Sequence, residues 1–166
     1  SEHIVDVVRV LGSSEYAKSA TEAYLIQNNI PVDFSEEALN QAKQYVNAVI
    51  DEKQTAKRLD LRDLPIFTID GADTKDIDDA ISIERTEGGY KLGVHIADVS
   101  HYVTEGSPLD NDAFERGTSV YIADKVIPML PKELSNGICS LNPGVDRLAF
   151  SCLMEISDKG TVKKYK

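Results

Sequence analysis

The stretch AISIERTEGGYKLGVHI, residues 80–96, is the part of the sequence that best predicts the fold. Two arms, 80–85 and 90–96, flank Glu87-Gly88-Gly89, and this arrangement is typical of a β-hairpin. Apolar residues alternate with other residues along the second arm, as expected of a half-buried strand. The hairpin therefore predicts that strands form the centre of the fold.

Further strands and helices are predicted on both sides of the hairpin. Strands are predicted over residues 3–11, 66–69, 119–122 and 148–156. Helices are predicted from Ser13 or Ser14 to about Asn28, from Asp33 or Ser35 to Ile50, and from Ser107-Pro108 to about Gly117. The second helix carries an apolar stripe at Leu39, Ala42, Val46, Val49 and Ile50. These elements predict the α+β class, with a mixed β-sheet and flanking helices.

The composition favours a folded protein that is not embedded in a membrane. The chain has 166 residues, of which 42% are hydrophobic, so it can bury a core. No apolar run reaches membrane-spanning length and no signal peptide opens the chain, so we expect no membrane partner. Cys139 and Cys152 lack the spacing of a metal site, which indicates reduced thiols and a cytoplasmic location.

The net charge of -10 argues against a self-sufficient nucleic-acid binder. Such proteins usually carry a basic patch that supplies most of their affinity. Two interpretations follow from the charge. Either the substrate is not a nucleic acid, or the basic surface lies on parts absent from this chain.

An acidic stretch, TIDGADTKDIDDA, precedes the hairpin at residues 68–80. Five aspartates fall within ten residues and are opposed only by Lys75. Carboxylates this dense repel one another, and a folded domain tolerates them mainly when a cation lies among them. Hard oxygen ligands suit Mg²⁺ or Mn²⁺, and a divalent site that also accepts a phosphate is typical of phosphodiester hydrolysis. The alternative is an acidic surface loop.

The chain must fold back if these aspartates are to share one cation. Fully extended, the segment from Asp70 to Asp76 would span roughly 20 Å. Gly71 permits the necessary bend. Asp76 and Asp78 are expected on one face of a short extended piece, with Asp79 on the other. An EF-hand is excluded, because the glycine and the final glutamate of that loop are not in place.

A second polar cluster follows the hairpin at residues 95–101. His95 is either a metal ligand or base, or a hydrogen-bonded core residue. A single histidine on an alternating strand favours the core role. Asp98 is expected to hold His101 or to cap the turn.

Three residues further along each have two candidate roles. Tyr121 lies in a predicted strand, where most tyrosines are packing residues. Lys125 and Arg147 could contact phosphates, although solvated surface is the more usual place for such side chains. The pattern alone favours packing for Tyr121 and solvated surface for Lys125 and Arg147.

Three ordered motifs resemble the catalytic domain, or RNB domain, of the ribonuclease II/ribonuclease R family. They are TIDGADTKDIDDA, HIADVSHYV and RGTSVYIADKVIPMLPKELSNGICSLNPGVDRLAFS. The resemblance covers roughly Leu61 to Lys166 and is closer to ribonuclease R, whose members typically read DGxD where Asp70 to Asp73 stand. It implies a tail of a preceding OB-fold or cold-shock domain at 1–12, a helical connector at 13–64, and the N-terminal portion of the catalytic domain at 65–166.

The resemblance implies a processive, hydrolytic exoribonuclease that degrades single-stranded RNA from the 3′ end to nucleoside 5′-monophosphates, with Mg²⁺. Asp70, Asp76, Asp78 and Asp79 match the four catalytic-site aspartates, and all four are candidate metal residues. Asp70 and Asp79 resemble direct ligands, while Asp76 helps to hold the site. Asp78 is tied most closely to the chemical step. Tyr121 matches the aromatic residue that stacks on a base near the 3′ end.

The resemblance also limits what this chain is expected to do alone. Family members continue through a second half of the catalytic domain, which carries an arginine for the transition state and a second aromatic clamp. We therefore expect the isolated chain to be inactive and most of the basic RNA-binding surface to lie elsewhere. Expected partners are single-stranded RNA and, as further candidates, other RNA-decay or ribosome-associated factors. The alternatives are a non-catalytic cation-binding module and an inactive RNA-binding adaptor.

Overall fold

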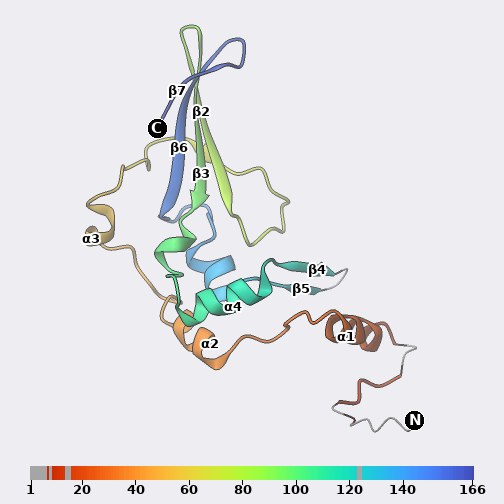
Figure 1. Cartoon of the computed structure of the whole chain (residues 1–166). Helices are drawn as coiled ribbons and strands as arrows, with labels where there is room; N and C mark the ends of the chain where they lie inside the picture. Colours follow the sequence, from red (N-terminus) through yellow and green to blue (C-terminus); the bar gives the residue numbers. More distant parts are fainter. Residues whose placement is uncertain (1–6, 8, 14–15, 123–124) are drawn as a thin grey trace.

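A five-stranded sheet forms the centre of the computed structural model, which describes residues 7, 9–13, 16–122 and 125–166 (Figure 1). Its strands lie in the order β1 (Ile66–Phe67), β2 (Asp79–Thr86), β3 (Gly89–Ala97), β6 (Ala149–Ser157) and β7 (Val162–Tyr165). Each neighbouring pair in this sheet runs antiparallel. Short turns join β2 to β3 and β6 to β7, and strands joined in this way pair antiparallel. The α+β class is confirmed, and the sheet is antiparallel rather than mixed.

The predicted hairpin is confirmed as β2 and β3, which are joined by a turn at Gly88. This residue has a φ of 83°, in the left-handed region that glycine adopts readily. A Cβ at Gly89 would lie 1.9 Å from the carbonyl oxygen of Ile156, so glycine lets β6 approach this closely. Burial alternates along β3 as predicted, but the alternating apolar residues lie on its more exposed face, where Ile96 is 45% exposed. Local sequence therefore determines this hairpin well.

The helices α2 and α4 lie near the end of the sheet where β3 ends and β6 begins (Figure 1). The described helices are α1 (Ala17–Gln27), α2 (Glu36–Lys43), α3 (Glu52–Thr55), the 3₁₀ turn η1 (Val99–His101), α4 (Pro108–Arg116) and the π-helix η2 (Glu133–Ile138). A separate two-stranded ribbon comprises β4 (Val120–Ile122) and β5 (Lys125–Ile127). Ser35 and Ser107 cap α2 and α4 as predicted. Among the described residues, no helix has the length and apolar character to span a membrane.

The second helix is shorter than its apolar stripe predicts. α2 ends at Lys43, and Val46 and Val49 are 57% and 83% exposed. After α2 the backbone amides bond to the carbonyl oxygen three residues earlier, as in a 3₁₀ turn. The hydroxyl of Tyr45 donates to the carbonyl oxygen of Tyr102 at 3.0 Å. This tertiary contact accompanies the end of the helix, which the stripe alone does not predict.

The N-terminal predictions are met only in part. α1 is confirmed, but it begins at Ala17 with Tyr16 in the N-cap position. Ser14, one of the two predicted caps, lies outside the described residues. The predicted strand over 3–11 is not found in its described residues, 7 and 9–11, and its other residues lie outside the described part.

The main hydrophobic core lies where the helices meet the end of the sheet. Its buried residues are Ala38, Ala42, Tyr102, Leu109, Leu134, Ile138, Cys139 and Leu148. They come from α2, α4, η2 and the segments next to the sheet, so the core joins parts far apart in the sequence. Arg116 adds a further link by donating hydrogen bonds to the carbonyl oxygens of Pro31 and Asp33.

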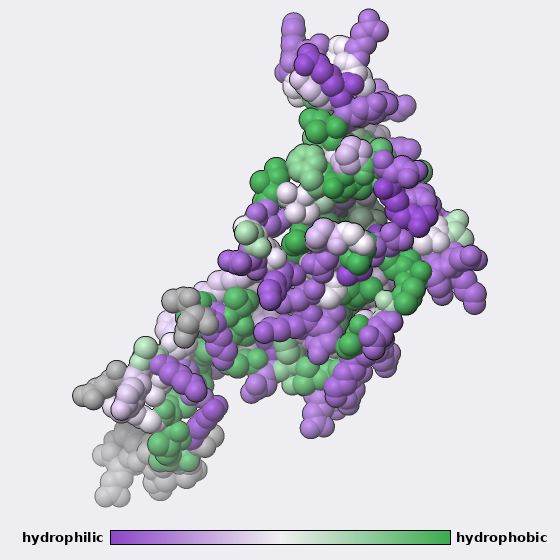
Figure 2. All heavy atoms as spheres, turned by 180° about the vertical axis from the view of Figure 1, so that it is seen from behind, coloured by the Kyte–Doolittle hydropathy of each residue, from purple (hydrophilic) through white to green (hydrophobic). Residues whose placement is uncertain are grey.

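The sheet exposes much more apolar surface than the helical core. Ile83 and Phe150 are 48% and 78% exposed, and the strand register places them on one face with Tyr165. Figure 2 shows apolar side chains at the surface in the part of the molecule that contains the strands. The described chain therefore covers this face of the sheet only in part.

Candidate functional site

The acidic stretch forms the loop between β1 and β2, residues 68–78, here called the aspartate loop. β1 pairs antiparallel with β2, so the chain folds back as predicted. Asp70, shortly after β1, and Asp79, at the start of β2, therefore lie at the same end of the sheet. The bend is closed by a hydrogen bond of 3.0 Å from the amide of Thr74 to the carbonyl oxygen of Gly71. Gly71 has a φ outside the left-handed region, so the turn does not use its special conformational freedom.

The second half of the aspartate loop is anchored at its backbone. The hydroxyl of Ser140 donates to the carbonyl oxygen of Lys75 at 2.8 Å and accepts from the amide of Ile77 at 3.1 Å. Ile77 is buried. Its neighbours Asp76 and Asp78 are more exposed, in keeping with the common face predicted for them.

The four predicted aspartates act on one another electrostatically. Burial raises the pKa of Asp78, and the negative charges of Asp76, Asp79 and Asp70 raise it further. The fold therefore brings all four into one electrostatic neighbourhood. Among the described residues, however, no three Asp, Glu, His or Cys side chains are grouped as a metal site. The four carboxylates therefore affect one another electrostatically but are not grouped closely enough to coordinate one metal ion as they stand. Their roles as metal ligands stay predictions.

Tyr121 of β4 reaches the aspartate loop from a distant part of the sequence. Its hydroxyl donates a hydrogen bond of 3.0 Å to Oδ2 of Asp76, and this bond is the main cause that raises the pKa of Tyr121. The residue is 68% exposed, so it is not a packing residue. An exposed aromatic ring beside carboxylates offers a surface on which a base can stack. The stacking role itself stays a prediction.

His95 is a core residue of the sheet, as the strand pattern favours. It is 2% exposed, and its Nε2 and Nδ1 lie 3.0 Å and 2.9 Å from the hydroxyls of Ser82 and Ser151. Burial lowers the pKa of His95, which keeps the ring neutral at neutral pH. Gly93 leaves room for this arrangement, because a Cβ there would lie 2.4 Å from the hydroxyl of Ser82.

Asp98 pairs with Arg58 rather than with His101. The guanidinium of Arg58 donates to Asp98 at 2.6 Å, and the hydroxyl of Ser100 donates at 2.9 Å and closes the turn. Burial alone would raise the pKa of Asp98, but the hydrogen bonds from Arg58 and Ser100 outweigh it and lower the pKa. His101 instead lies 2.9 Å from the side-chain amide of Gln54. These contacts fasten α3 to η1 and give Asp98 a structural role.

Arg147 donates hydrogen bonds to backbone carbonyl oxygens of the protein itself. This differs from both predicted roles, contact with phosphates and exposure on a solvated surface. Its Nε donates to the carbonyl oxygen of Ser140 at 2.8 Å, and its Nη2 donates to that of Gly137 at 3.2 Å. Lys125 is exposed at the start of β5. Ser140 is the residue that sequence reasoning missed, since its partners Lys75 and Ile77 are 65 and 63 positions away and leave no local pattern.

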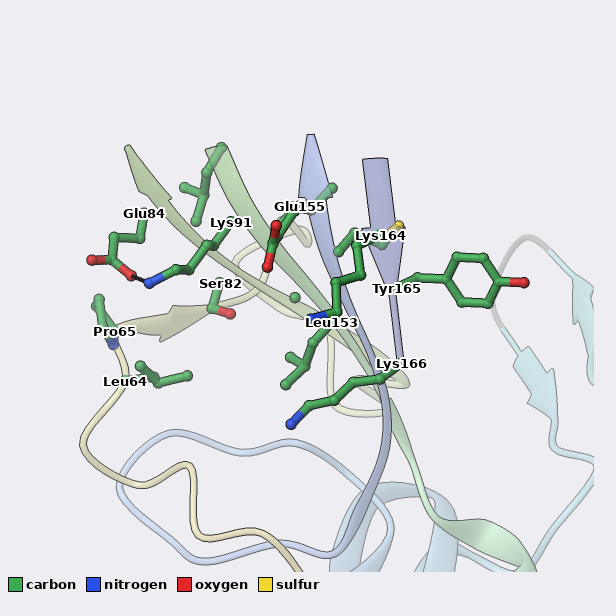
Figure 3. A pocket seen from close by; sticks show the side chains of 14 residues that line it. Leu64, Pro65, Ser82, Glu84, Lys91, Leu153, Glu155, Lys164, Tyr165 and Lys166 are labelled. Carbon is green, nitrogen blue, oxygen red and sulfur yellow. Dashed lines mark hydrogen bonds and ion pairs between the residues drawn. The ribbon is translucent and has the colours of Figure 1, made fainter. Parts of the chain in front are cut away.

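A hollow of about 410 Å³ lies on one face of the sheet (Figure 3). Glu84 and Lys91 form an ion pair of 3.3 Å in its wall, and Tyr165 points away from it. Its lining contains none of the predicted site residues. The candidate site therefore consists of the aspartate loop and Tyr121.

Comparisons with known proteins agree with the motifs. Residues 58–166 match the model of the RNB domain. Ribonuclease R 1 of Lactococcus lactis subsp. lactis (strain IL1403) is 52% identical over 160 residues, which make up 96% of this chain and 20% of that protein. Mycoplasma genitalium RNase R in complex with ribose methylated single-stranded RNA has a TM-score of 0.88 at 34% identity, covering 95% of this chain and 24% of that chain. Yeast Ssd1, a pseudonuclease, has a TM-score of 0.77 at 20% identity, covering 94% of this chain and 20% of that chain, a likeness that shows the fold alone.

The chain spans about a fifth of the length of the curated relatives it matches. The occurrence of the fold in a pseudonuclease means that function must be argued from side chains rather than from architecture. The matched model covers well over half of the chain and includes the aspartate loop and Tyr121. On this match, the chain belongs to the RNB domain family.

Proposed function

We propose that this chain supplies the aspartate-bearing part of the active site of an exoribonuclease that degrades single-stranded RNA from the 3′ end. The contact between Tyr121 and Asp76 carries the proposal, because it fixes an exposed aromatic ring to a group of mutually repelling carboxylates. A surface for a base and a site for a phosphate would then be adjacent. The activity is proposed for this sequence within a polypeptide of the length of its relatives.

The four aspartates would hold a divalent cation, which we take to be Mg²⁺, with Mn²⁺ as the alternative. Hard carboxylate oxygens suit these ions, and burial together with three neighbouring charges raises the pKa of Asp78, a strain that a cation relieves. When bound, the cation supplies charge neutralisation and polarisation at the phosphate. Asp70 and Asp79 would serve as direct ligands. Asp76 would hold the site, and Asp78 would act at the chemical step.

Tyr121 would stack on a base near the 3′ end and so set how the terminal phosphodiester meets the aspartates. Stacking of this kind contributes roughly 1–3 kcal/mol per base. Its hydroxyl bond to Asp76 would keep the ring in place between successive cleavages, in keeping with processive release of nucleoside 5′-monophosphates. Because this chain has a net charge of -10, basic surface elsewhere in the longer protein would bind the RNA phosphates.

We also assign the protein to the cytoplasm. Cys139 and Cys152 are both free, as expected of a protein in a reducing compartment. Fractionation of cells that express the longer protein tests this assignment, and recovery in an oxidising compartment would contradict it.

The test of the activity uses the longer protein and RNA labelled at its 5′ end, with either a free or a blocked 3′ end. We expect stepwise shortening of the free RNA, release of nucleoside 5′-monophosphates, protection of the blocked RNA, and loss of activity with a chelator. Internal cuts or shortening from the 5′ end would contradict the proposal. Binding without turnover would favour an inactive RNA-binding adaptor.

A further inference from the structure

Ser140 lies directly after η2 and Cys139, and its side chain is fully buried. A hydroxyl has one proton to donate and lone pairs to accept with. The shortest contact of the Ser140 hydroxyl, 2.8 Å to the carbonyl oxygen of Lys75, takes the proton, and the amide of Ile77 fills a lone pair at 3.1 Å. A weaker contact to Asn142 has a length of 3.3 Å. One side chain therefore satisfies two backbone groups of the aspartate loop.

The two backbone groups belong to the residues on either side of Asp76. Fixing the carbonyl of Lys75 and the amide of Ile77 restrains the backbone through Asp76 and up to Asp78. Leu141, the next residue after Ser140, donates its amide to the carbonyl oxygen of Ile77 at 2.9 Å. The 140–141 segment thus holds this part of the loop at three backbone groups, one of Lys75 and two of Ile77.

Ser140 is itself held in place from behind. Arg147 donates to the carbonyl oxygens of Ser140 and Gly137, which ties the end of η2 to the start of β6. Gly137 adopts an irregular conformation inside η2, with φ of -104° and ψ of -111°. The irregular end of this helix places the hydroxyl at the loop, so the chain of contacts runs from Arg147 through Ser140 to the backbone on both sides of Asp76.

We propose that Ser140 is a positioning residue that sets the backbone under Asp76 and Asp78 for catalysis. This inference rests on the proposed function for its kinetic consequence, but not for its structural one. Ser140 is fully buried, so its side chain offers no surface for a direct contact with RNA. Its loss should therefore change turnover rather than substrate binding.

The structural readout is hydrogen exchange of the Ile77 amide, measured by NMR in the 166-residue chain. Ser140→Ala should speed this exchange roughly fivefold to thirtyfold relative to amides of the sheet, the range expected for one lost hydrogen bond. Cys139→Ala is the matched control. It removes an adjacent buried side chain but keeps the hydroxyl, so it should leave the relative exchange of Ile77 unchanged.

The kinetic readout uses the same variants in the longer protein. Ser140→Ala should lower kcat roughly tenfold or more and leave KM within about threefold, while Cys139→Ala leaves both within about threefold. Unchanged exchange of Ile77 in Ser140→Ala would overturn the inference, whatever the activity of the parent. Faster exchange with unchanged kcat would also overturn it. A parent that does not degrade RNA would contradict the proposed function, and the exchange of Ile77 would then decide the role of Ser140 alone.

Discussion

The two halves of the aspartate loop are held in different ways. Residues 75–78 are fastened to distant parts of the fold by partners such as Ser140 and Ala97, whereas residues 68–74 are held, in the part of the chain that is described, by the turn bond at Gly71. The aspartates look equivalent in the sequence. The comparison teaches that backbone anchors, rather than the acidic side chains themselves, distinguish fixed carboxylates from adaptable ones.

The sharpest test of this comparison is a matched pair of isoleucines, one in each half. Ile77 is buried and Ile69 is 82% exposed. Ile77→Ala should lower the free energy of unfolding by roughly 2–5 kcal/mol, because it leaves a cavity under the anchored half. Ile69→Ala should change it by less than about 0.5 kcal/mol. Urea unfolding of the 166-residue chain measures both, and equal losses would remove the distinction.

The second test compares two aspartates by removing one charge from each half. In the longer protein, Asp78→Asn should slow RNA turnover by about 100-fold or more, at least ~2.7 kcal/mol of barrier. Asp73→Asn removes the same charge from the turn and should stay within severalfold of the parent. Single-turnover rates on a labelled RNA give the ratio. If the two variants lose activity alike, the loop acts through its total charge and not through placed carboxylates.

Cation binding should draw on the first half of the loop, through Asp70, and on Asp79 at the start of β2. At a free Mg²⁺ or Mn²⁺ concentration near 100 times the dissociation constant, binding would add about 2.7 kcal/mol to the stability of the chain. The double variant Asp70→Asn/Asp79→Asn should lose this gain. A control that neutralises Asp63 and Asp73 removes as much charge and should keep it. Thermal unfolding during a metal titration follows the effect, and an equal response of both double variants would contradict the ligand assignment.

Two substitutions of Tyr121 separate the role of its aromatic ring from the role of its hydroxyl bond to Asp76. Tyr121→Ala loses the stack, worth roughly 1–3 kcal/mol, and should change the length of the shortest RNA product. Tyr121→Phe keeps the ring and loses the bond to Asp76, so it should keep the product length and slow turnover about fivefold, near 1 kcal/mol. Gel analysis of end products decides this. Identical product patterns for both variants would mean that the ring has no role of its own.

Most of the fold could be predicted because it depends on neighbours in the sequence. The hairpin at Gly88 and the caps at Ser35 and Ser107 each depend on a few adjacent residues, and all three are confirmed. The end of α2 was missed because the apolar stripe gives no sign of the contact between Tyr45 and Tyr102, a residue far along the chain.

The candidate site divides along the same line. The motif predicted the four aspartates and Tyr121 as site residues, and the fold brings Tyr121 into contact with Asp76 across 45 positions. Pattern alone favoured packing for Tyr121, and the fold exposes it instead. Ser140 and Arg147 could not be assigned, because a buried serine and a partly buried arginine acquire their roles only when the loop is folded against η2.

The neutral His95 makes the stability of the sheet depend on proton binding. In the unfolded chain its pKa returns to the ordinary 6.5, whereas burial lowers it in the fold. Below pH 6.5, His95 binds a proton in the unfolded chain but stays neutral in the folded chain until a lower pH is reached. Acid therefore favours unfolding. This contribution is fully present above pH 6.5 and is lost as the pH falls, by up to about 1.4 kcal/mol per pH unit. His95→Gln, which can still bond to Ser82 and Ser151, should flatten the pH dependence of unfolding in this range, and parallel curves for the two proteins would contradict the linkage.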